Sequence, residues 1–333
     1  MRLPPARGPL SGLVVEHLSA RGGASDAVEQ AAREATAPGA GLDDEDVQLS
    51  LWLLHETHHH GFDEVDDARE WEPGLVAGRL VLEAALEREL RRTVPVPQVD
   101  GHQDVAETLF ALTAPTPGPS LSRYVARTAD EAQVRELLVH RSVYQLAEAD
   151  PHTWAIPRLT GRAKAALVEI QADEYGGGRP ERMHSALFAR TMRGAGLVDE
   201  YGHYLDRAPA VTLAHLNVMR MFGLNRRLRG AAVGHLAAFE MTSSLPNRGY
   251  GDGFRRLGFD AGTTEYFDEH VEADAVHEQI AARDLAAGLV ADEPALLADV
   301  LFGAAACLAV DDLVAEHLVA AWTAGRTSLR VAA

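Results

Sequence analysis

The chain contains very little cysteine and no long apolar run. Its one cysteine, Cys307, excludes an internal disulfide framework and a metal site built from thiolates, and it suits a reducing cytoplasm. The longest apolar run, near residues 300–310, is interrupted by Gly303 and is far shorter than the roughly 18–20 residues that cross a bilayer. The first thirty residues show no signal-peptide pattern. We therefore expect a soluble, cytoplasmic protein that does not span a membrane.

Positive charge is also scarce. The 333 residues include 31 Lys or Arg against 49 Asp or Glu, which gives a formal net charge of −18. Phosphate binding needs a basic stripe, and none is visible in the sequence, so nucleic acid is not an expected partner. Hydrophobic residues make up 47% of the chain, which excludes bulk disorder and is enough for one large core or two smaller ones.

Clusters of β-branched residues bounded by turns are nearly absent, whereas helical periodicity recurs along the chain. The pattern predicts an all-α protein with an N-terminal helical extension over residues 1–119 and a helical bundle over 120–333. The proline-rich segments 94–99 and 114–120 separate the two. We expect the glycine-rich residues 249–258 to form a loop. The expected helices cover residues 25–36, 43–59, 73–92, 102–113, 130–149, 161–174, 181–194, 212–229, 230–243, 264–287 and 293–322.

The segment 269–277 carries the strongest functional signal. Residues four and seven positions apart share one face of a helix, so His270, Asp274 and His277 form a stripe. With a rise of about 1.5 Å per residue, the two histidines lie roughly 10 Å apart along the axis, too far for both to bind one ion. The stripe therefore favours two metal ions with Asp274 between them. Imidazole and carboxylate ligands suit iron or manganese.

A dinuclear site also needs Glu and His side chains from other helices, and without them the stripe is only a solvated surface. Glu240 lies in an otherwise apolar helix, where an unpaired carboxylate is costly, so a metal ion or an arginine must neutralise it. Glu174 ends another apolar helix. His184 follows after three glycines and Pro180, which break the helix and allow both side chains to reach one cluster.

These residues resemble the ligand pattern of the haem-oxygenase-like diiron oxidases, a family of iron-containing redox enzymes. In that family one core region carries a Glu and a His, the next a Glu, and the last a His-x-x-x-Asp-x-x-His. The resemblance covers roughly residues 141–330. It extends to an extra upstream Glu of the N-oxygenating branch, a position that Glu148 occupies here, with Asp150 and Glu169 as competitors. The implied metal ligands are Glu148, Glu174, His184, Glu240, His270, Asp274 and His277.

The resemblance implies a haem-oxygenase-like bundle that holds two iron ions, as Fe(II) or Fe(III), and takes O2 as co-substrate, with no catalytic residue beyond the ligands. Because two ferrous ions supply only two of the electrons for O2 reduction, turnover also needs an electron donor or electrons from the substrate. We expect a small-molecule substrate and a homodimer.

Glu148 favours N-oxygenation of a small amine or amino-acid-like substrate. The alternative is oxidative C–C or C–H cleavage, by decarboxylation or desaturation of a small carboxylic or amino acid. The substrate-binding residues stay open, because arginines near the motifs could either clamp a carboxylate or form surface ion pairs. These arginines are Arg141, Arg179, Arg182 and Arg248.

Residues 55–59 form a competing motif. His55, Glu56 and His59 satisfy the His-Glu-x-x-His pattern, in which two histidines one turn apart bind zinc and the glutamate acts as a base. No clear third ligand follows on a helix, since the nearest acidic candidates lie beside Pro73. A zinc hydrolase is therefore a second alternative, together with non-catalytic metal binding by the ligands of the proposed iron site.

Overall fold

The structure is a computed structural model. It describes residues 1–19, 26–36, 41–99, 104–115 and 120–331. All longer regular elements within these residues are helices, and the all-α prediction is confirmed. None of the described helices combines the length and the apolar character that a bilayer crossing requires. The helices are α1 Pro9–Ser19, α2 Asp26–Ala35, α3 Glu45–Glu56, α4 Pro73–Thr93, α5 Val105–Leu112, α6 Leu121–Arg127, α7 Glu131–Gln145, α8 Asp150–Thr153, α9 Gly161–Glu174, α10 His184–Gly194, α11 Ala210–Leu224, α12 Arg229–Met241, α13 Ser244–Arg256, α14 Ala261–Gln279, α15 Ala287–Asp292 and α16 Leu297–Thr323.

Local sequence signals set several helix ends. Asp130 and Gln133 form a reciprocal capping box at the start of α7, which satisfies two backbone N–H groups that the helix itself leaves free. Asp260 caps α14 by accepting from the backbone N–H of Thr263 at 2.8 Å. Helix α9 ends where Gly176 takes a left-handed conformation with φ of 66°, which an L side chain rarely adopts.

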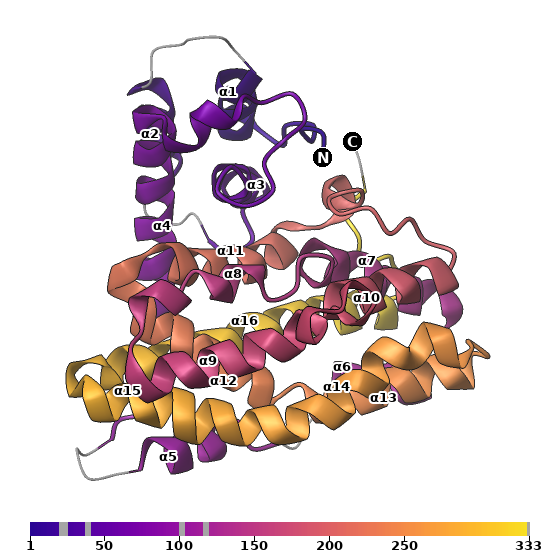
Figure 1. Ribbon diagram of the computed structural model, residues 1–333. Coiled ribbons are helices and arrows are strands. Elements are labelled where there is room, and N and C mark those ends of the chain that lie inside the picture. The colour runs from indigo at the N-terminus through magenta and orange to yellow at the C-terminus, as the bar shows by residue number, and fades with distance from the viewer. Residues whose placement is uncertain (20–25, 37–40, 100–103, 116–119, 332–333) are drawn as a thin grey trace.

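The core is a bundle in which α12 lies along α16 and α14 lies along α10 and α13 (Figure 1). Helices α12 and α16 approach so closely that a Cβ on Gly234 would collide with the backbone carbonyl of Val300, and one on Gly303 with that of Ala231. Helix α14 continues through the π-helical segment Ile280–Ala286 into α15, so these elements form one long rod.

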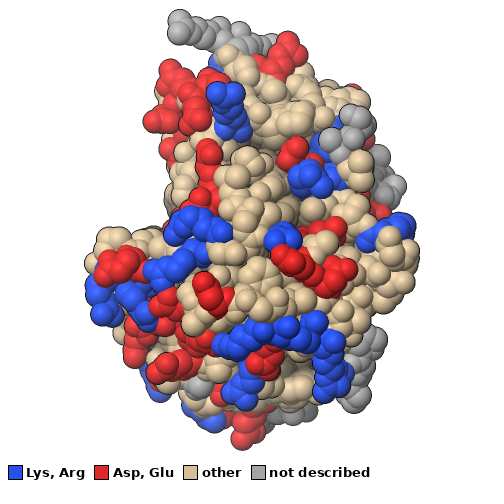
Figure 2. Space-filling view, turned by 90° about the vertical axis from the view of Figure 1, so that its right-hand side faces the viewer, with Lys and Arg blue, Asp and Glu red and all other residues tan. Residues whose placement is uncertain are grey.

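The N-terminal helices α1, α2 and α3 form a layer beside this bundle (Figure 1), and α3 packs against α11. Helix α5 lies on the opposite side, against the π-helical segment and α16. Helices of the predicted extension therefore contact the bundle on two opposite sides. The domain boundary between residues 119 and 120 stays a prediction. On the face in Figure 2, acidic and basic side chains are interspersed.

Two predictions about helix positions are wrong. Residues 249–258 lie mostly in helix α13, because the glycines allow close helix packing here and do not form a turn. A Cβ on Gly253 would lie 2.5 Å from the carbonyl oxygen of Val125 in α6, and one on Gly249 would lie 3.0 Å from that of Ser122. Helix α7 ends at Gln145, four residues earlier than predicted, and an irregular turn follows. Helices α1 and α6 were not predicted, since proline-rich sequence adjoins both.

Candidate metal centre

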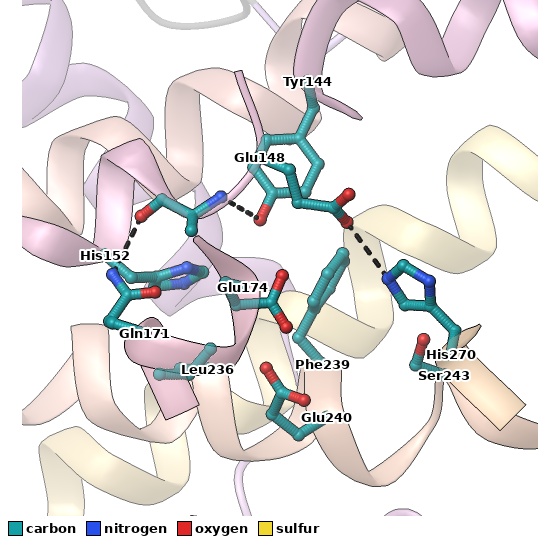
Figure 3. Close-up of a pocket in the computed structure, with 11 residues that line it drawn as sticks. Tyr144, Glu148, His152, Gln171, Glu174, Leu236, Phe239, Glu240, Ser243 and His270 are labelled. Carbon is teal, nitrogen blue, oxygen red and sulfur yellow. Dashed lines mark hydrogen bonds and ion pairs between the residues drawn. The ribbon is translucent and has the colours of Figure 1, made fainter. Parts of the chain in front are cut away.

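Six of the seven predicted ligands lie together inside the bundle. Figure 3 shows four of them, Glu148, Glu174, Glu240 and His270. We call these six residues the candidate metal centre. Each side chain comes from a different helix or turn, apart from the two histidines of α14, and each residue is at most 7% exposed. Glu148 lies in the turn after α7, Glu174 ends α9, His184 begins α10, Glu240 lies near the end of α12, and His270 and His277 lie on α14.

The candidate metal centre consists of two groups of potential ligands that share one residue. In each group the potential donor atoms lie within 4.8 Å of one another. The first contains Glu148, Glu174, His184 and His270, and the second contains Glu174, Glu240 and His277.

Glu174 lies between the two groups and directs one oxygen to each. Its Oε2 lies 2.8 Å from Nδ1 of His184, while its Oε1 lies 3.9 Å from Nδ1 of His277. The close approach to His184 does not have the geometry of a hydrogen bond. Two donor atoms that converge in this way fit a cation held between them, and Glu174 belongs to both ligand groups.

Hydrogen bonds fix the orientation of the two histidines of α14. Nδ1 of His270 lies 2.8 Å from the backbone carbonyl of Tyr266, which assigns the proton to Nδ1 and leaves Nε2 toward Glu148 at 3.5 Å. His277 is oriented the other way. Its Nε2 lies 3.1 Å from Oδ2 of Asp173, and its Nδ1 lies 3.2 Å from Oε2 of Glu240. Each ring therefore directs one nitrogen into the centre and anchors the other, as metal-binding histidines do.

Glu148 is held by a buried tyrosine. The hydroxyl of Tyr266 lies 2.9 and 3.0 Å from the two carboxylate oxygens and donates to one of them. Burial, followed by the charge of Glu148, raises the pKa of Tyr266 far above its usual value, so the phenol keeps its proton. The competitors for this position are placed elsewhere: Glu169 is exposed on α9, and Asp150 accepts from Tyr175 at 2.8 Å.

The charges in the candidate metal centre favour the binding of a cation. Among the described residues no Lys or Arg pairs with its three carboxylates, whose ion-pair partners are all histidines. Burial, with the charge of Glu174, raises the pKa of Glu240. Burial lowers the pKa of His277, but the hydrogen bond and charge of Glu240 outweigh it and raise the value to about 10. Without a metal the site therefore keeps protons, and a divalent cation would displace them.

Asp274 follows His270 by one turn on α14, but its side chain lies outside the described residues. Its role as a ligand therefore stays a prediction. The chemistry of the remaining donors is clear without it, because imidazole nitrogens and carboxylate oxygens in a buried, cysteine-free site suit iron.

The centre borders a small cavity with mixed walls (Figure 3). Leu236 and Phe239 form an apolar part, whereas Gln171 and His152 are polar. Burial lowers the pKa of His152 to about 4, so this ring is neutral at pH 7, and its Nε2 lies 3.2 Å from Nδ1 of His235. The cavity has room for about one water-sized molecule beside the donor atoms, and part of its wall is apolar.

Sequence reasoning missed the residues that support the ligands. Asp173 directly precedes Glu174, and Tyr266 lies one turn before His270, so both have a sequence signal only once the ligands are known. No periodic pattern identifies Tyr266 as the partner of Glu148, because 118 residues separate them.

The zinc-hydrolase interpretation of residues 55–59 is wrong. Glu56 forms a buried ion pair with Arg220 at 2.5 Å and accepts from the hydroxyl of Tyr201 at 2.9 Å, so its carboxylate is not free to act as a base. Nε2 of His55 lies 2.9 Å from Oε1 of Glu83 and forms a hydrogen bond with it. Helix α3 ends at Glu56, so the second histidine of the motif no longer lies on the same helix.

The four arginines differ in their surroundings. Arg182 pairs with Glu265 and Glu269 on α14, which is the surface ion-pair role. Arg179 lies 3.4 Å from the carbonyl oxygen of Gly176, and Arg248 is exposed. Arg141 is different, since it lies partly buried over the ring of Tyr250, with 4.5 Å between its guanidinium carbon and the ring centre.

Comparison with known proteins agrees with this site. Residues 135–312, more than half of the chain, match the profile of the family described as iron-containing redox enzymes. The chain belongs to this family of iron-containing redox enzymes and has the expected haem-oxygenase-like helical bundle.

Individual relatives are distant. The chain is 30% identical over 162 residues to nitrosourea synthase of Streptomyces achromogenes subsp. streptozoticus, a match that covers 48% of this chain and 34% of that protein. It thus spans about a third of the length of this curated relative. A crystal structure of a CADD-like protein of unknown function from Nostoc punctiforme is also similar, with 15% identity and a TM-score of 0.47. That similarity covers 72% of this chain and 97% of the other.

Proposed function

We propose that the chain is a non-haem diiron oxygenase that uses O2 to oxidise the nitrogen of a small amine or amino-acid-like substrate. The observation that carries the proposal is that two groups of buried ligands share Glu174. One ion cannot satisfy both groups, because His270 and His277 lie roughly 10 Å apart along their helix at about 1.5 Å per residue. Two neighbouring ions bridged by one carboxylate can.

Several residues of the chain would hold the ligands and line the cavity at such a site. When bound, two ferrous ions would supply two of the four electrons that reduce O2, oxidation of the substrate nitrogen would supply the other two, and an electron donor would return the ions to the ferrous state. Tyr266 holds Glu148 through its hydroxyl, and Asp173 holds the ring of His277, so that the donor atoms are positioned before the ions arrive. Leu236 and Phe239 keep water from the cavity where the substrate nitrogen would lie.

Two observations support nitrogen as the atom that is oxidised. Glu148 occupies the extra carboxylate position that resembles the N-oxygenating branch, and it lies within the first ligand group. The relative that shares 30% identity is named nitrosourea synthase, which denotes a product with an N–N=O group. A third carboxylate next to the shared Glu174 adds negative charge, which stabilises the more highly charged ferric state.

The experiment combines metal analysis with a substrate screen. Protein produced in iron-rich medium is expected to hold two iron ions per chain by mass spectrometry. It should consume O2 with a reductant and a panel of amines and amino acids, and convert one of them to a hydroxylamine or nitro product. Fragmentation or desaturation of an acid, with every amine unchanged, would replace N-oxygenation by the C–C/C–H alternative.

A matched pair of variants tests the role of Glu148. Glu148→Gln is expected to remove N-oxygenation and to lower iron occupancy in the first group. Glu169→Gln makes the same chemical change at an exposed position of α9 and should retain both properties. Bound iron without O2 consumption in the unaltered protein would instead indicate a non-catalytic metal-binding protein.

A further inference from the structure

Asp173 connects the candidate metal centre to the surface of the protein. Its Oδ2 lies 3.1 Å from Nε2 of His277, and its side chain is 62% exposed. Glu148 and His270, by contrast, form their hydrogen bonds with Tyr266, which is buried. The contact between Asp173 and His277 is therefore a direct route from solvent to a potential ligand. Because electron transfer slows steeply with distance, a protein that reduces the centre must bind close to such a point.

The surface around Asp173 is formed by two helices that lie side by side. Asp173 contacts His277 of α14, and Arg162 of α9 pairs with Asp284 in the π-helical segment that continues α14. Figure 1 shows α9 beside the rod formed by α14 and α15. We call the exposed residues of this surface the α9–α14 face. They are Val168, Ala172 and Asp173 on α9, and Glu272 and Val276 on α14.

The α9–α14 face is acidic and partly apolar. Neither Asp173 nor Glu272 pairs with a Lys or Arg of the described residues, whereas the neighbouring Glu269 pairs with Arg182. Val276 is 59% exposed, although it directly precedes a buried histidine of the centre. Exposed apolar side chains beside unpaired charges of one sign are typical of a surface that binds a partner of opposite charge.

The charge of the chain selects the kind of partner. A second copy would carry the same net charge of −18 and would present the same acidic face, and like charges repel each other. A protein with a basic surface would instead be attracted. The α9–α14 face is also small, and interfaces between redox partners that meet transiently bury less area than those of stable dimers. The face therefore fits a basic protein that binds briefly.

We propose that the α9–α14 face is the docking site of a basic electron-transfer protein that reduces the candidate metal centre. Basic side chains of the partner surround Asp173 and Glu272, and its apolar surface covers Val276. Each ferric ion takes up one electron and becomes ferrous, so one turnover consumes two molecules of a reduced one-electron carrier, which leave oxidised. The inference rests on the proposed function, because it takes the centre to hold two iron ions.

The first experiment locates the docking site in the metal-free chain. The probe is ferricytochrome c, a small basic protein with one haem. A carbodiimide joins carboxylates to lysine amines that are in contact, and mass spectrometry identifies the joined residues. We expect the joined carboxylates of this chain to lie on α9 and α14, with Asp173 or Glu272 among them, and the yield to fall as the ionic strength rises. Joined carboxylates confined to other helices would overturn the proposal.

The second experiment measures electron transfer through the same face in the reverse direction. The iron-loaded chain is reduced, mixed with ferricytochrome c in the absence of O2, and followed by the absorbance of the haem. Two ferrous ions then reduce two molecules of the probe. Cytochrome c with succinylated lysines keeps its haem but presents negative charge. It should react roughly tenfold or more slowly at low ionic strength, because repulsion replaces attraction.

A matched pair of double variants connects the rate to the face. Ala172→Lys/Glu272→Lys should slow the reaction with cytochrome c roughly tenfold or more, because it makes the face basic, and it should leave the iron content unchanged. Glu16→Lys/Ala320→Lys makes the same two changes at exposed positions of α1 and α16 and should react like the unaltered chain. Glu272→Gln removes one charge and should give a smaller decrease even if the lysine variant does not fold.

Two further results would overturn the proposal. Equal slowing in both double variants would show that only the net charge matters, and equal rates with both forms of cytochrome c would show that charge has no role. The outcome is separate from that of the proposed function. Slower electron transfer in the face variant alone, without oxidation of any amine, would retain the docking site and refute N-oxygenation. Oxidation of an amine by a chain that is cross-linked only elsewhere would do the reverse.

Discussion

Asp173 offers a sharp test of how the ligands are held, because within the described part of the chain it contacts one histidine of the candidate metal centre and none of its other residues. Its Oδ2 lies 3.1 Å from Nε2 of His277, which fixes the ring so that Nδ1 faces Glu240 and Glu174. Removing such a support typically lowers metal affinity 10–100-fold, or by about 1.4–2.7 kcal/mol. The Asp173 side chain is 62% exposed, and solvent screening places the expected loss at the lower end, near tenfold.

The change is Asp173→Ala, and the loss should be confined to the second ligand group. Competition with a chromophoric chelator should therefore show one ion released about tenfold more readily while the other keeps its affinity. Asp252→Ala removes an aspartate whose side chain is 61% exposed on α13, and it should leave both affinities unchanged. Equal weakening of both ions, or no weakening at all, would contradict the assignment of His277 to a separate ion.

Three further predictions concern stability and the residues around the centre. Glu56→Gln should lower the free energy of unfolding by roughly 3 kcal/mol, because Arg220 stays buried without its partner, yet iron content should not change; a lower iron content would contradict the purely structural role of this ion pair. Gly234→Ala should lower the free energy of unfolding by roughly 1–3 kcal/mol, because the added Cβ would collide with α16. Gly262→Ala, where the nearest atom lies 3.6 Å from the added Cβ, should leave the stability in thermal unfolding unchanged or raise it. Burial, with the charge of His317, lowers the pKa of His140 to about 3, so the folded chain binds this proton less readily than the unfolded chain. This contribution to stability is complete above about pH 6.5 and falls by about 1.4 kcal/mol per pH unit as the pH decreases toward 3. Urea unfolding at pH 7.5 and 5.0 should therefore differ less in His140→Asn than in the unaltered chain, and equal differences would contradict this account.

The stripe on α14 and the apolar surroundings of Glu240 were readable from the sequence, because both depend on helical periodicity. Residues seven positions apart must share a face wherever a helix forms, and a carboxylate among apolar residues must be neutralised wherever that helix packs. The same local reasoning predicted most of the helices. It failed for α13, where the spacing of the glycines reflects contact with α6 and not a turn.

The convergence of the ligands was decided by tertiary structure alone. Glu174 faces both ligand groups only because α9, α10, α12 and α14 meet at its position, and Glu148 enters the first group from an irregular turn that no periodicity predicts. The His-Glu-x-x-His motif illustrates the converse. The sequence pattern alone fits a zinc site. In the folded protein, however, Glu56 pairs with Arg220, which lies 164 residues further along the chain, and this ion pair gives the motif a structural role. Periodicity restricts which side chains can share a helix face, whereas packing between distant segments determines what those side chains meet.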